Sequence, residues 1–428
     1  MSFEGVSPYA FRLASLTLEH IERRRTSLEV AFQKALNSVG RSDPHALKLA
    51  RRALLSFAKA DLLLEASGLG NIPLRRKCAY RVAFALLEEG VYVGRLEAGL
   101  LSDRLRALLT RRALEEVAHL VSGLPPAQRL AVENSFPPWI IDEVSKHLGL
   151  REAEKLVKAC SRRTIWIRIN ELKISRGKAL SALRRYADLR EDKEFPEVLE
   201  LVGVEDPPPD VLKMAERGLI VIQDKGSVAV AHALGDSRNL LVMDAAAAPG
   251  LKTSLLQQLS SNEAEIVAVD VSRRRLDEMR KLLSRLGVRN VRLLLADSRI
   301  AKFTRKFDKI LLDAPCTNTG AIASDPALRL VLWKPAGIDK FPLLQKSLLT
   351  NTLEHLKDGG DLVYSTCSLL SSEGESLIET LPLDWLSSEG LWGSPGYQNF
   401  ACSSRVRRLF PHIHRTTAFF VAKIRPHS

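Results

Sequence analysis

Several familiar signatures are missing from this sequence of 428 residues. Its five cysteines are widely spaced and form no Cys-x-x-Cys pair, so we expect neither a metal site nor a disulfide framework. No apolar run reaches the roughly 18 residues that a membrane-spanning helix needs. The N-terminus also lacks the basic start and apolar stretch of a secretory signal. These absences predict a cytoplasmic protein with free thiols.

Two nucleotide-binding signatures are absent as well. Neither Gly-x-Gly-x-x-Gly nor the phosphate loop Gly-x-x-x-x-Gly-Lys-[Ser/Thr] occurs, which disfavours nicotinamide cofactors and nucleoside triphosphates. Acidic residues are outnumbered, 50 against 63 basic ones, for a net charge of +13. A basic surface favours polyanions such as nucleic acid, although it is also compatible with an ordinary solvated surface.

The length predicts two or three domains. Residues 1–135 contain only helical patterns, for example the apolar repeat that follows Asp43 as a helix cap and Pro44 as the first helical residue. Residues 136–210 predict a small α/β subdomain. From 211 to 428, short apolar runs alternate with amphipathic helices, which indicates a Rossmann-like α/β domain.

The apolar runs of this last segment have the length of buried strands. They cover residues 240–245, 265–270, 291–297, 307–313, 361–366 and 418–424. Because helical segments separate most of them, we expect a largely parallel sheet with helices on both faces. Such a sheet binds ligands beyond the carboxyl ends of its strands.

The first three predicted strands each end in an aspartate. Asp244 ends the first strand and precedes the small-residue turn AAAAPG, which lets a ligand approach the backbone where a helix begins. Asp270 and Asp297 end the next two strands. An acid at such a place suits ribose hydroxyls or an adenine edge, although each could also be a cap or turn residue. Three in succession predict a site for one nucleoside-containing ligand.

The next two strands each lead into a cysteine. One reads DAPCTNTG, with Asp313 and Cys316, and the other YSTCS, with Cys367. If the two strands are neighbours, both thiols point into the same crevice. A single cysteine at a strand end is usually a small buried side chain, but two at matching ends predict a reactive pair. Position alone does not say which thiol reacts.

These motifs resemble the RsmB/NOL1/NSUN family of RNA 5-methylcytosine methyltransferases over residues 136–428. The family's D-x-C-A-A-P-G-G-K-T reads DAAAAPGLKT here, its DAPC-S-G-T-G reads DAPCTNTG, and its YSTCS followed by acids reads YSTCSLLSSEGE. Upstream, WIRINELK is similar to L-R-x-N-x-L-K, and GLIVIQDKGSVAVAHAL contains the family's Q-D-x-x-S element. The helical N-terminal segment resembles the NusB-like domain of the rRNA-methylating branch.

The resemblance implies S-adenosylmethionine as the cofactor. It places the cofactor shell on Ala246, Ala247, Ala248, Pro249, Gly250, Leu251, Lys252, Asp270, Asp297 and Asp313. It also implies that Cys367 attacks ring carbon 6 of cytosine, which makes carbon 5 able to accept a methyl group. Cys316 takes part in release of the product. Asp313 is expected to hydrogen-bond ring nitrogen 3, and Lys252 to orient the base and favour the thiolate.

The chain departs from the family pattern at several positions. Ala246 replaces a cysteine and Leu251 replaces the second glycine of the first motif. Thr317 and Asn318 replace Ser-Gly of the fourth motif, and HRTTAFF lacks the Asp and Gly of the usual T-D-G-F-F. None of these changes removes an expected catalytic group.

Other functions would use the same residues differently. A DNA cytosine-5 methyltransferase would use Cys316 as nucleophile, but the second thiol of YSTCS favours RNA. Amino-group methyltransferases need P-P-[Tyr/Phe] after the fourth strand, which DAPC does not supply. A different class is a non-catalytic RNA-binding or ribosome-assembly factor. We expect a monomer with rRNA as substrate and tRNA as the alternative. Base-unstacking candidates are Arg329, Trp333, Lys334, His412 and Arg415.

Overall fold

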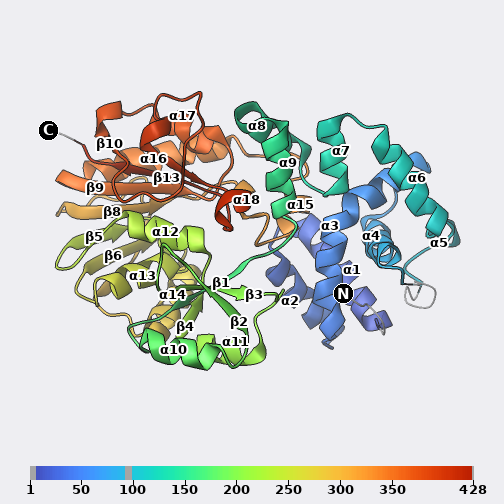
Figure 1. The fold of residues 1–428 in the computed structure, drawn as a ribbon, viewed down its shortest axis with the longest axis horizontal. Helices are drawn as coiled ribbons and strands as arrows, with labels where there is room; N and C mark the ends of the chain where they lie inside the picture. Colours follow the sequence, from blue (N-terminus) through green and yellow to red (C-terminus); the bar gives the residue numbers. More distant parts are fainter. Residues whose placement is uncertain (1–5, 92–98, 427–428) are drawn as a thin grey trace. The chain divides into compact units, whose positions relative to one another are not determined.

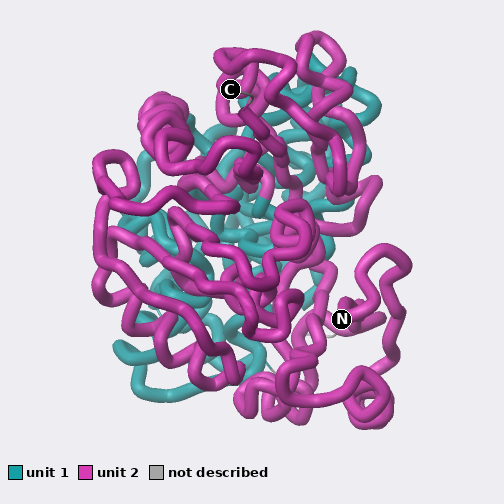
Figure 2. Tube along the Cα trace, turned by 90° about the vertical axis from the view of Figure 1, so that its left-hand side faces the viewer, with its two compact units in different colours: residues 1–162, 321–336 teal, residues 163–320, 337–428 magenta. Residues whose placement is uncertain are grey.

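The chain folds into two compact units, which Figure 2 shows in different colours. In this computed structural model, residues 6–91 and 99–426 are described. One unit comprises residues 1–162 and 321–336, and the other residues 163–320 and 337–428. The predicted three-domain division at 135 and 210 stays a prediction, and part of its helical segment, residues 92–98, lies outside the described residues.

The first unit is built from helices throughout its described elements (Figure 1). The helices are α1 (Pro8–Arg24), α2 (Leu28–Val39), α3 (Pro44–Ala66), α4 (Leu74–Glu88), α5 (Asp103–Ala107), α6 (Arg111–Ser122), α7 (Pro126–Glu133), α8 (Pro138–Leu148), α9 (Leu150–Ala159) and α15 (Ala327–Val331). Helix α3 begins as predicted, because the Asp43 side chain accepts a hydrogen bond from the backbone N–H of His45 and Pro44 follows the cap.

Residues 321–336 are part of the helical unit although they lie within the sequence of the other one. Ala327 and Leu330 of α15 belong to the same buried apolar cluster as Phe11 and Phe57 of α1 and α3. The chain therefore leaves the second unit directly after Gly320, contributes one short helix to the helical core, and returns at residue 337.

The second unit begins with a small antiparallel sheet. Its strands are β1 (Ile165–Ile169), β2 (Asp188–Glu191), β3 (Val198–Val202) and β4 (Ile220–Ile222), in the order β2-β3-β1-β4. Two short helices, α10 (Arg176–Leu183) and α11 (Pro209–Glu216), accompany it. Apolar side chains from these helices and strands form one buried cluster. This sheet contains the WIRINELK element, whose strand is β1.

The larger sheet of the second unit has nine strands in the order β11-β12-β13-β9-β8-β5-β6-β7, with β10 beside β13. They are β5 (Leu241–Asp244), β6 (Glu265–Asp270), β7 (Val291–Leu295), β8 (Phe307–Asp313), β9 (Leu356–Thr366), β10 (Leu386–Ser387), β11 (Ser394–Pro395), β12 (Arg407–Leu409) and β13 (Phe419–Ile424). Strands β5 to β9 pair in parallel, whereas β13 runs antiparallel to β9. The predicted Rossmann-like sheet is therefore confirmed.

Helices cover both faces of this sheet (Figure 1). Helices α12 (Lys225–Ala233) and α13 (Leu251–Leu259) share a buried cluster with Val242, Ile266 and Leu311 on one face. Helix α14 (Arg273–Leu286) packs beside them. Helix α16 (Lys340–Glu354) shares the opposite cluster with Met243 and Ile310. Neighbouring residues of one strand thus point to opposite faces, as expected for strands buried on both sides.

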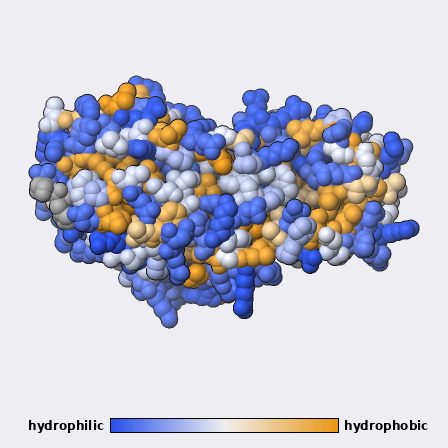
Figure 3. Space-filling model, turned by 90° about the horizontal axis from the view of Figure 1, so that it is seen from above, coloured by the Kyte–Doolittle hydropathy of each residue, from blue (hydrophilic) through white to orange (hydrophobic). Residues whose placement is uncertain are grey.

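Among the described residues, no helix combines the length and the apolar character needed to cross a bilayer. On the face drawn in Figure 3, hydrophilic residues predominate and the hydrophobic ones are divided among several separate areas.

Candidate active site

The small-residue turn that is predicted to bind the cofactor, residues 245–250, lies between β5 and α13 and is called the cofactor turn below. Asp244, the last residue of β5, is 1% exposed and accepts a hydrogen bond of 2.6 Å from the Thr253 hydroxyl of α13. Burial raises the pKa of Asp244 to about 7, against the smaller lowering effect of the Thr253 hydrogen bond. Asp244 therefore ties the strand to the helix that follows the turn, whereas the turn itself is left for a ligand.

Gly250 is the N-cap residue of α13 and has a φ of +100°, a conformation that side chains disfavour. A Cβ atom at this position would lie 2.8 Å from Cγ of Met279 on α14. This glycine is therefore required both by the backbone and by the close packing of α14 against the turn. The substituted neighbour, Leu251, is the first residue of α13 and is only partly buried.

Asp270, at the end of β6, contacts the same turn. Its carboxylate accepts the backbone N–H groups of Ala248 at 3.3 Å and Ser272 at 2.9 Å. Arg275 of α14 pairs with it at 3.2 Å and also donates to the backbone oxygen of Ala248. Arg275 thereby links the strand-end acid to the cofactor turn. Sequence reasoning missed this residue, although its place in the first turn after the strand-end acid was a usable signal.

Asp297 follows the end of β7. Arg299 binds its carboxylate in a bidentate manner, with Nε at 3.0 Å from Oδ1, and this hydrogen bonding lowers the pKa of Asp297. The backbone N–H of Arg299 also donates to Oδ1, at 3.0 Å, so a ligand that binds this carboxylate shares it with Arg299. Two apolar side chains near these acids are exposed, Val271 to 66% and Ile300 to 73%. Acids beside exposed apolar groups fit the ribose and adenine of S-adenosylmethionine, so the residues present suit this cofactor.

Lys252 and Asp313 form an ion pair at the junction of α13 and β8. Lys252 Nζ lies 2.6 Å from Asp313 Oδ2, and the hydroxyl of Ser365 donates to Oδ1 at 2.7 Å. The register of β8 with β9 places Asp313 directly beside Ser365. Burial lowers the pKa of Lys252, but the charge of Asp313 and its hydrogen bond outweigh this effect and raise the pKa overall. Lys252 is therefore a cation, and it faces the Cys367 thiol as well as Asp313.

The two thiols lie next to each other. Cys316 Sγ is 3.1 Å from Cys367 Sγ, so neighbouring strands do bring them into one place. Cys316 is 6% exposed, whereas Cys367 is partly accessible. The hydrogen bond to Cys367, together with burial, raises the pKa of Cys316 well above its ordinary value. Cys316 thus stays protonated, because two thiolates at this distance would repel each other.

Buried polar groups fix the loop that contains Cys316. Gln345 of α16 donates to the backbone oxygen of Pro315 at 2.9 Å. The Glu373 carboxylate, which is fully buried, accepts the backbone N–H of Thr317 at 3.1 Å and its hydroxyl at 2.9 Å. Burial raises the pKa of Glu373, and these hydrogen bonds partly offset that effect. The residues before and after Cys316 are therefore each held from another element. Glu373 is one of the acids after YSTCS.

A buried ion pair fixes the turn after Cys367. Arg408 of β12 binds both oxygens of Glu375, at 2.7 and 2.5 Å, and both side chains are fully buried. The same guanidinium donates to the backbone oxygens of Ser368 at 3.0 Å and Leu370 at 3.2 Å. The thiol of Cys367 therefore sits on a turn whose carbonyl groups are held by a buried cation.

The upstream motif joins the small sheet to the cofactor helix. Arg168 of β1 is 1% exposed and donates to Ser254 at 2.7 Å and to Gln258, both on α13. It also donates to Gln223, at 2.8 Å, within the Q-D element. This arrangement makes Arg168 a structural connection to α13, which contains Lys252.

The departure HRTTAFF also has a structural explanation. Asp224, the N-cap of α12, accepts hydrogen bonds from the hydroxyls of Thr416 and Thr417. Thr416 in turn accepts the backbone N–H of Gly226 at 2.6 Å. The two threonines therefore hold the segment before β13 against α12.

The base-unstacking candidates differ in their burial and in their partners. Arg329 is fully buried in the helical unit, where it donates to the backbone oxygens of Asn134 at 2.6 Å and Cys160 at 2.7 Å. The expectation that it faces RNA is therefore wrong. Trp333 packs edge-on against Phe57, with ring centroids 5.0 Å apart. Of the remaining candidates, His412 is half-buried, Arg415 pairs with Glu200, and Lys334 is exposed.

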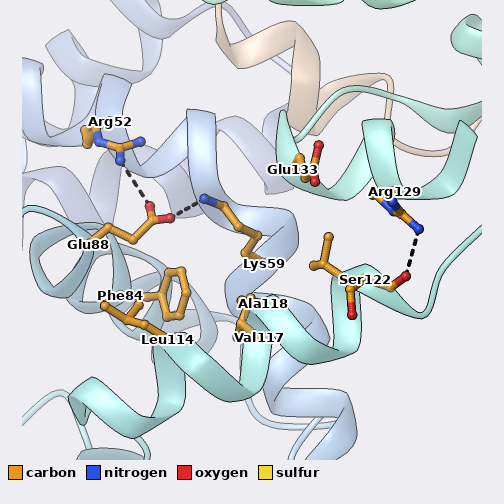
Figure 4. A pocket seen from close by; sticks show the side chains of 11 residues that line it. Arg52, Lys59, Phe84, Glu88, Leu114, Val117, Ala118, Ser122, Arg129 and Glu133 are labelled. Atoms are coloured by element: carbon orange, nitrogen blue, oxygen red, sulfur yellow. Dashed lines mark hydrogen bonds and ion pairs between the residues drawn. The ribbon is translucent and has the colours of Figure 1, made fainter. Parts of the chain in front are cut away.

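The helical unit has a pocket of its own (Figure 4). In it Glu88 lies between Arg52, at 3.2 Å, and Lys59, and Arg129 donates to the backbone of Ser122. The walls come from α3, α4, α6 and α7, none of which contains a predicted site residue. Because Glu88 and Glu89 together pair with Arg52 and Lys59, the pocket is not an open anion site.

Fold and site together define a class of enzyme. A Rossmann-like sheet with acids at successive strand ends, a small-residue turn and a Lys–Asp–Cys–Cys cluster is that of an S-adenosylmethionine-dependent methyltransferase. A family model described as "16S rRNA methyltransferase RsmB/F" matches residues 231–425, which include every predicted site residue.

Individual relatives extend the match beyond that segment. The chain is 28% identical to the probable ribosomal RNA small subunit methyltransferase B of Synechocystis over 97% of its own length and 99% of that protein. It is 37% identical to the tRNA (cytosine(72)-C(5))-methyltransferase of Pyrococcus horikoshii, but over only 50% of this chain and 54% of that relative. A solved methyltransferase homolog from Pyrococcus horikoshii is 34% identical, with a TM-score of 0.60, over 71% of this chain and 99% of that one. The chain belongs to the RsmB/NOL1/NSUN family of RNA 5-methylcytosine methyltransferases.

Proposed function

We propose that this enzyme methylates carbon 5 of a cytosine in ribosomal RNA, with Cys367 as the nucleophile. The observation that carries the proposal is the cluster at the ends of β8 and β9, where two thiols lie 3.1 Å apart beside the Lys252–Asp313 pair. Of the two thiols Cys367 is the accessible one, while Cys316 is buried and protonated. The accessible thiol is the one that a flipped-out base can reach.

The side chains have separate parts in the reaction. The Cys367 thiolate adds to ring carbon 6 of cytosine, which makes carbon 5 nucleophilic. As negative charge develops, ring nitrogen 3 takes up a proton from water and donates it in a hydrogen bond to the Asp313 carboxylate. Lys252 favours the thiolate through its positive charge. When bound, S-adenosylmethionine supplies the methyl group that carbon 5 accepts. The carbon-5 proton is then lost to water, the carbon–sulfur bond breaks and the Cys367 thiolate is restored, and Cys316 takes part in that release.

The cofactor shell extends from these residues to the neighbouring strand ends. The proposed contacts are Ala246, Ala247, Ala248, Pro249, Gly250, Leu251, Lys252, Asp270, Asp297 and Asp313. Asp270 binds the ribose hydroxyls and Asp297 the adenine edge, with Arg275 holding Asp270 against the turn. The position of Gly250 at the start of α13 leaves the first N–H groups of that helix directed at the ligand.

Ribosomal RNA is favoured over tRNA as the substrate because the relative named for ribosomal RNA matches more of the chain than the relative named for tRNA. The relative named for ribosomal RNA matches nearly the whole chain, including the helical unit, whereas the relative named for tRNA matches about half of it. The NusB-like resemblance of the N-terminal helices supports the same substrate. We also propose that the enzyme acts as a monomer, which sedimentation at working concentration tests.

The function is tested by methyl transfer from labelled S-adenosylmethionine to total rRNA and total tRNA. Bisulfite sequencing of RNA from a deletion strain identifies the target, and a lost methylcytosine in tRNA alone assigns tRNA as the substrate. Cofactor binding without incorporation into either RNA supports the non-catalytic assembly factor instead.

The roles of the thiols are tested by two variants. Cys367→Ala abolishes transfer, whereas Cys316→Ala retains a covalent protein–RNA adduct that survives denaturing electrophoresis. If Cys367→Ala retains the adduct instead, the two roles are reversed and Cys316 is the nucleophile.

A further inference from the structure

A side chain that the family pattern lacks contacts both thiols. Asn318 stands where the family has glycine, and its Oδ1 atom lies 2.9 Å from Cys367 Sγ and 3.7 Å from Cys316 Sγ. Its amide is therefore a hydrogen-bond partner of the thiol that is proposed to attack cytosine.

The backbone holds this amide in place. Asn318 has a φ of +59°, in the left-handed region that asparagine tolerates better than most residues. The residue before it, Thr317, is bound by Glu373, and the N–H of Gly320 donates to the backbone oxygen of Cys367 at 3.0 Å. Both flanks of Asn318 are thus tied to the segment around Cys367, which leaves its side chain little freedom to move away.

We propose that Asn318 is a further catalytic residue, whose side-chain amide holds the Cys367 sulfur and stabilises its thiolate by a hydrogen bond from Nδ2. The proposal rests on the proposed function, in that Cys367 is the nucleophile. A primary amide accepts through its oxygen and donates through its nitrogen. With the thiol protonated, Oδ1 accepts the S–H. Once the proton has passed to water, rotation of the amide presents an N–H to the sulfur anion.

Other groups besides Asn318 surround the two thiols, and they also influence how readily Cys367 loses its proton. Lys252 on α13 places a positive charge near the Cys367 sulfur, and Asp313 at the end of β8 pairs with that charge. Cys316 shares a hydrogen bond with Cys367, and Glu373 faces Cys316 from the other side. A change confined to Asn318 leaves these groups in place, so its effect on Cys367 can be read separately.

Two substitutions at Asn318 distinguish the effect of its side-chain hydrogen bond from the effect of its backbone conformation. Asn318→Gly restores the family residue and suits the positive φ, but removes the amide. Asn318→Asp keeps the shape and replaces the donor with a negative charge. Asn239→Gly is the matched control, because Asn239 also has a left-handed φ, of +57°, and is exposed on the turn before β5.

The measurement is the rate at which iodoacetamide alkylates Cys367 between pH 6 and pH 10, followed by mass spectrometry of its peptide in the full-length protein. A lost hydrogen bond to a charged group corresponds to about a tenfold change, so the midpoint of the Asn318→Gly profile is expected to rise by about one pH unit. The Asn318→Asp midpoint rises further, and the control matches the wild type. A substitution that only makes Cys367 easier for iodoacetamide to reach changes the alkylation rate at high pH, but not the pH at the midpoint of the profile.

Two results overturn the proposal: an Asn318→Gly midpoint equal to or below that of the wild type, or an Asn318→Asp midpoint below that of Asn318→Gly. In methyl transfer, kcat of Asn318→Gly falls about tenfold at neutral pH and recovers at high pH. The alkylation profile needs no RNA, so it distinguishes this proposal from the proposed function. If Cys367→Ala still transfers methyl groups, the nucleophile is wrong, whatever the profile shows.

Discussion

Replacing Glu375 by glutamine leaves the Arg408 guanidinium buried without its countercharge. Both side chains of this pair are fully buried and doubly hydrogen-bonded. Arg408 also lies 3.9 Å from the centre of the Tyr397 ring, so it cannot turn towards water without breaking that packing. The guanidinium must either remain as an uncompensated charge or draw water into the core.

The size of the effect follows from this burial. Removing one partner of a buried ion pair costs about 3–5 kcal/mol. For a folded unit of about 250 residues, each kcal/mol lowers the melting temperature by about 2–4 °C, so Glu375→Gln is expected to melt roughly 6–20 °C lower. Replacing both partners, as Arg408→Met with Glu375→Leu, removes both buried charges. The double variant is therefore expected to be more stable than Glu375→Gln alone.

Calorimetric and urea unfolding of the full chain measure these differences. Asp210→Asn is the control, because Asp210 and Lys213 form an exposed pair, 2.9 Å apart, in the same unit, and its loss should leave the transition unchanged. If Glu375→Gln melts with the wild type, Arg408 has no dependence on its countercharge and the reasoning fails. Additive losses in the double variant would show that the two residues do not act as a pair.

Two further predictions concern the cofactor turn. Burial raises the pKa of Asp244 to about 7 in the folded chain. The stability that this raised pKa contributes is therefore fully present below about pH 4, where the unfolded chain is also protonated, and is lost as the pH rises to 7. Asp244→Asn should therefore gain stability relative to the wild type over that range, by up to about 4 kcal/mol in urea unfolding; a pH-independent difference contradicts this. Gly250→Ala forces a Cβ against Met279 at a φ of +100°, and should weaken S-adenosylmethionine binding in calorimetric titration. Gly40→Ala, with a φ of +72° but open space around it, controls for backbone strain and should bind the cofactor normally.

The strands of the large sheet and the residues at their ends could be predicted from the amino-acid sequence. Two predicted strands, 265–270 and 307–313, have the same bounds as β6 and β8. They could be read because a strand buried on both faces is a short, nearly continuous apolar run, and that signal is local. The acids and cysteines at the ends of the strands could be predicted as site residues for the same reason. The family motifs added the roles, which position alone left open.

Which of these side chains contact one another depends on the folded structure. The thiols lie 3.1 Å apart because β8 and β9 are neighbours in the sheet, although 51 residues separate them in the chain. Arg329 was expected at the RNA, but its partners Asn134 and Cys160 lie 195 and 169 residues away, so no local pattern could show that it is buried. Asn318 was visible as a departure from the family glycine, and its contact with Cys367 was not. Local patterns report burial and chain direction, whereas distances between remote side chains depend on strand order and packing, which arise only when the whole chain folds.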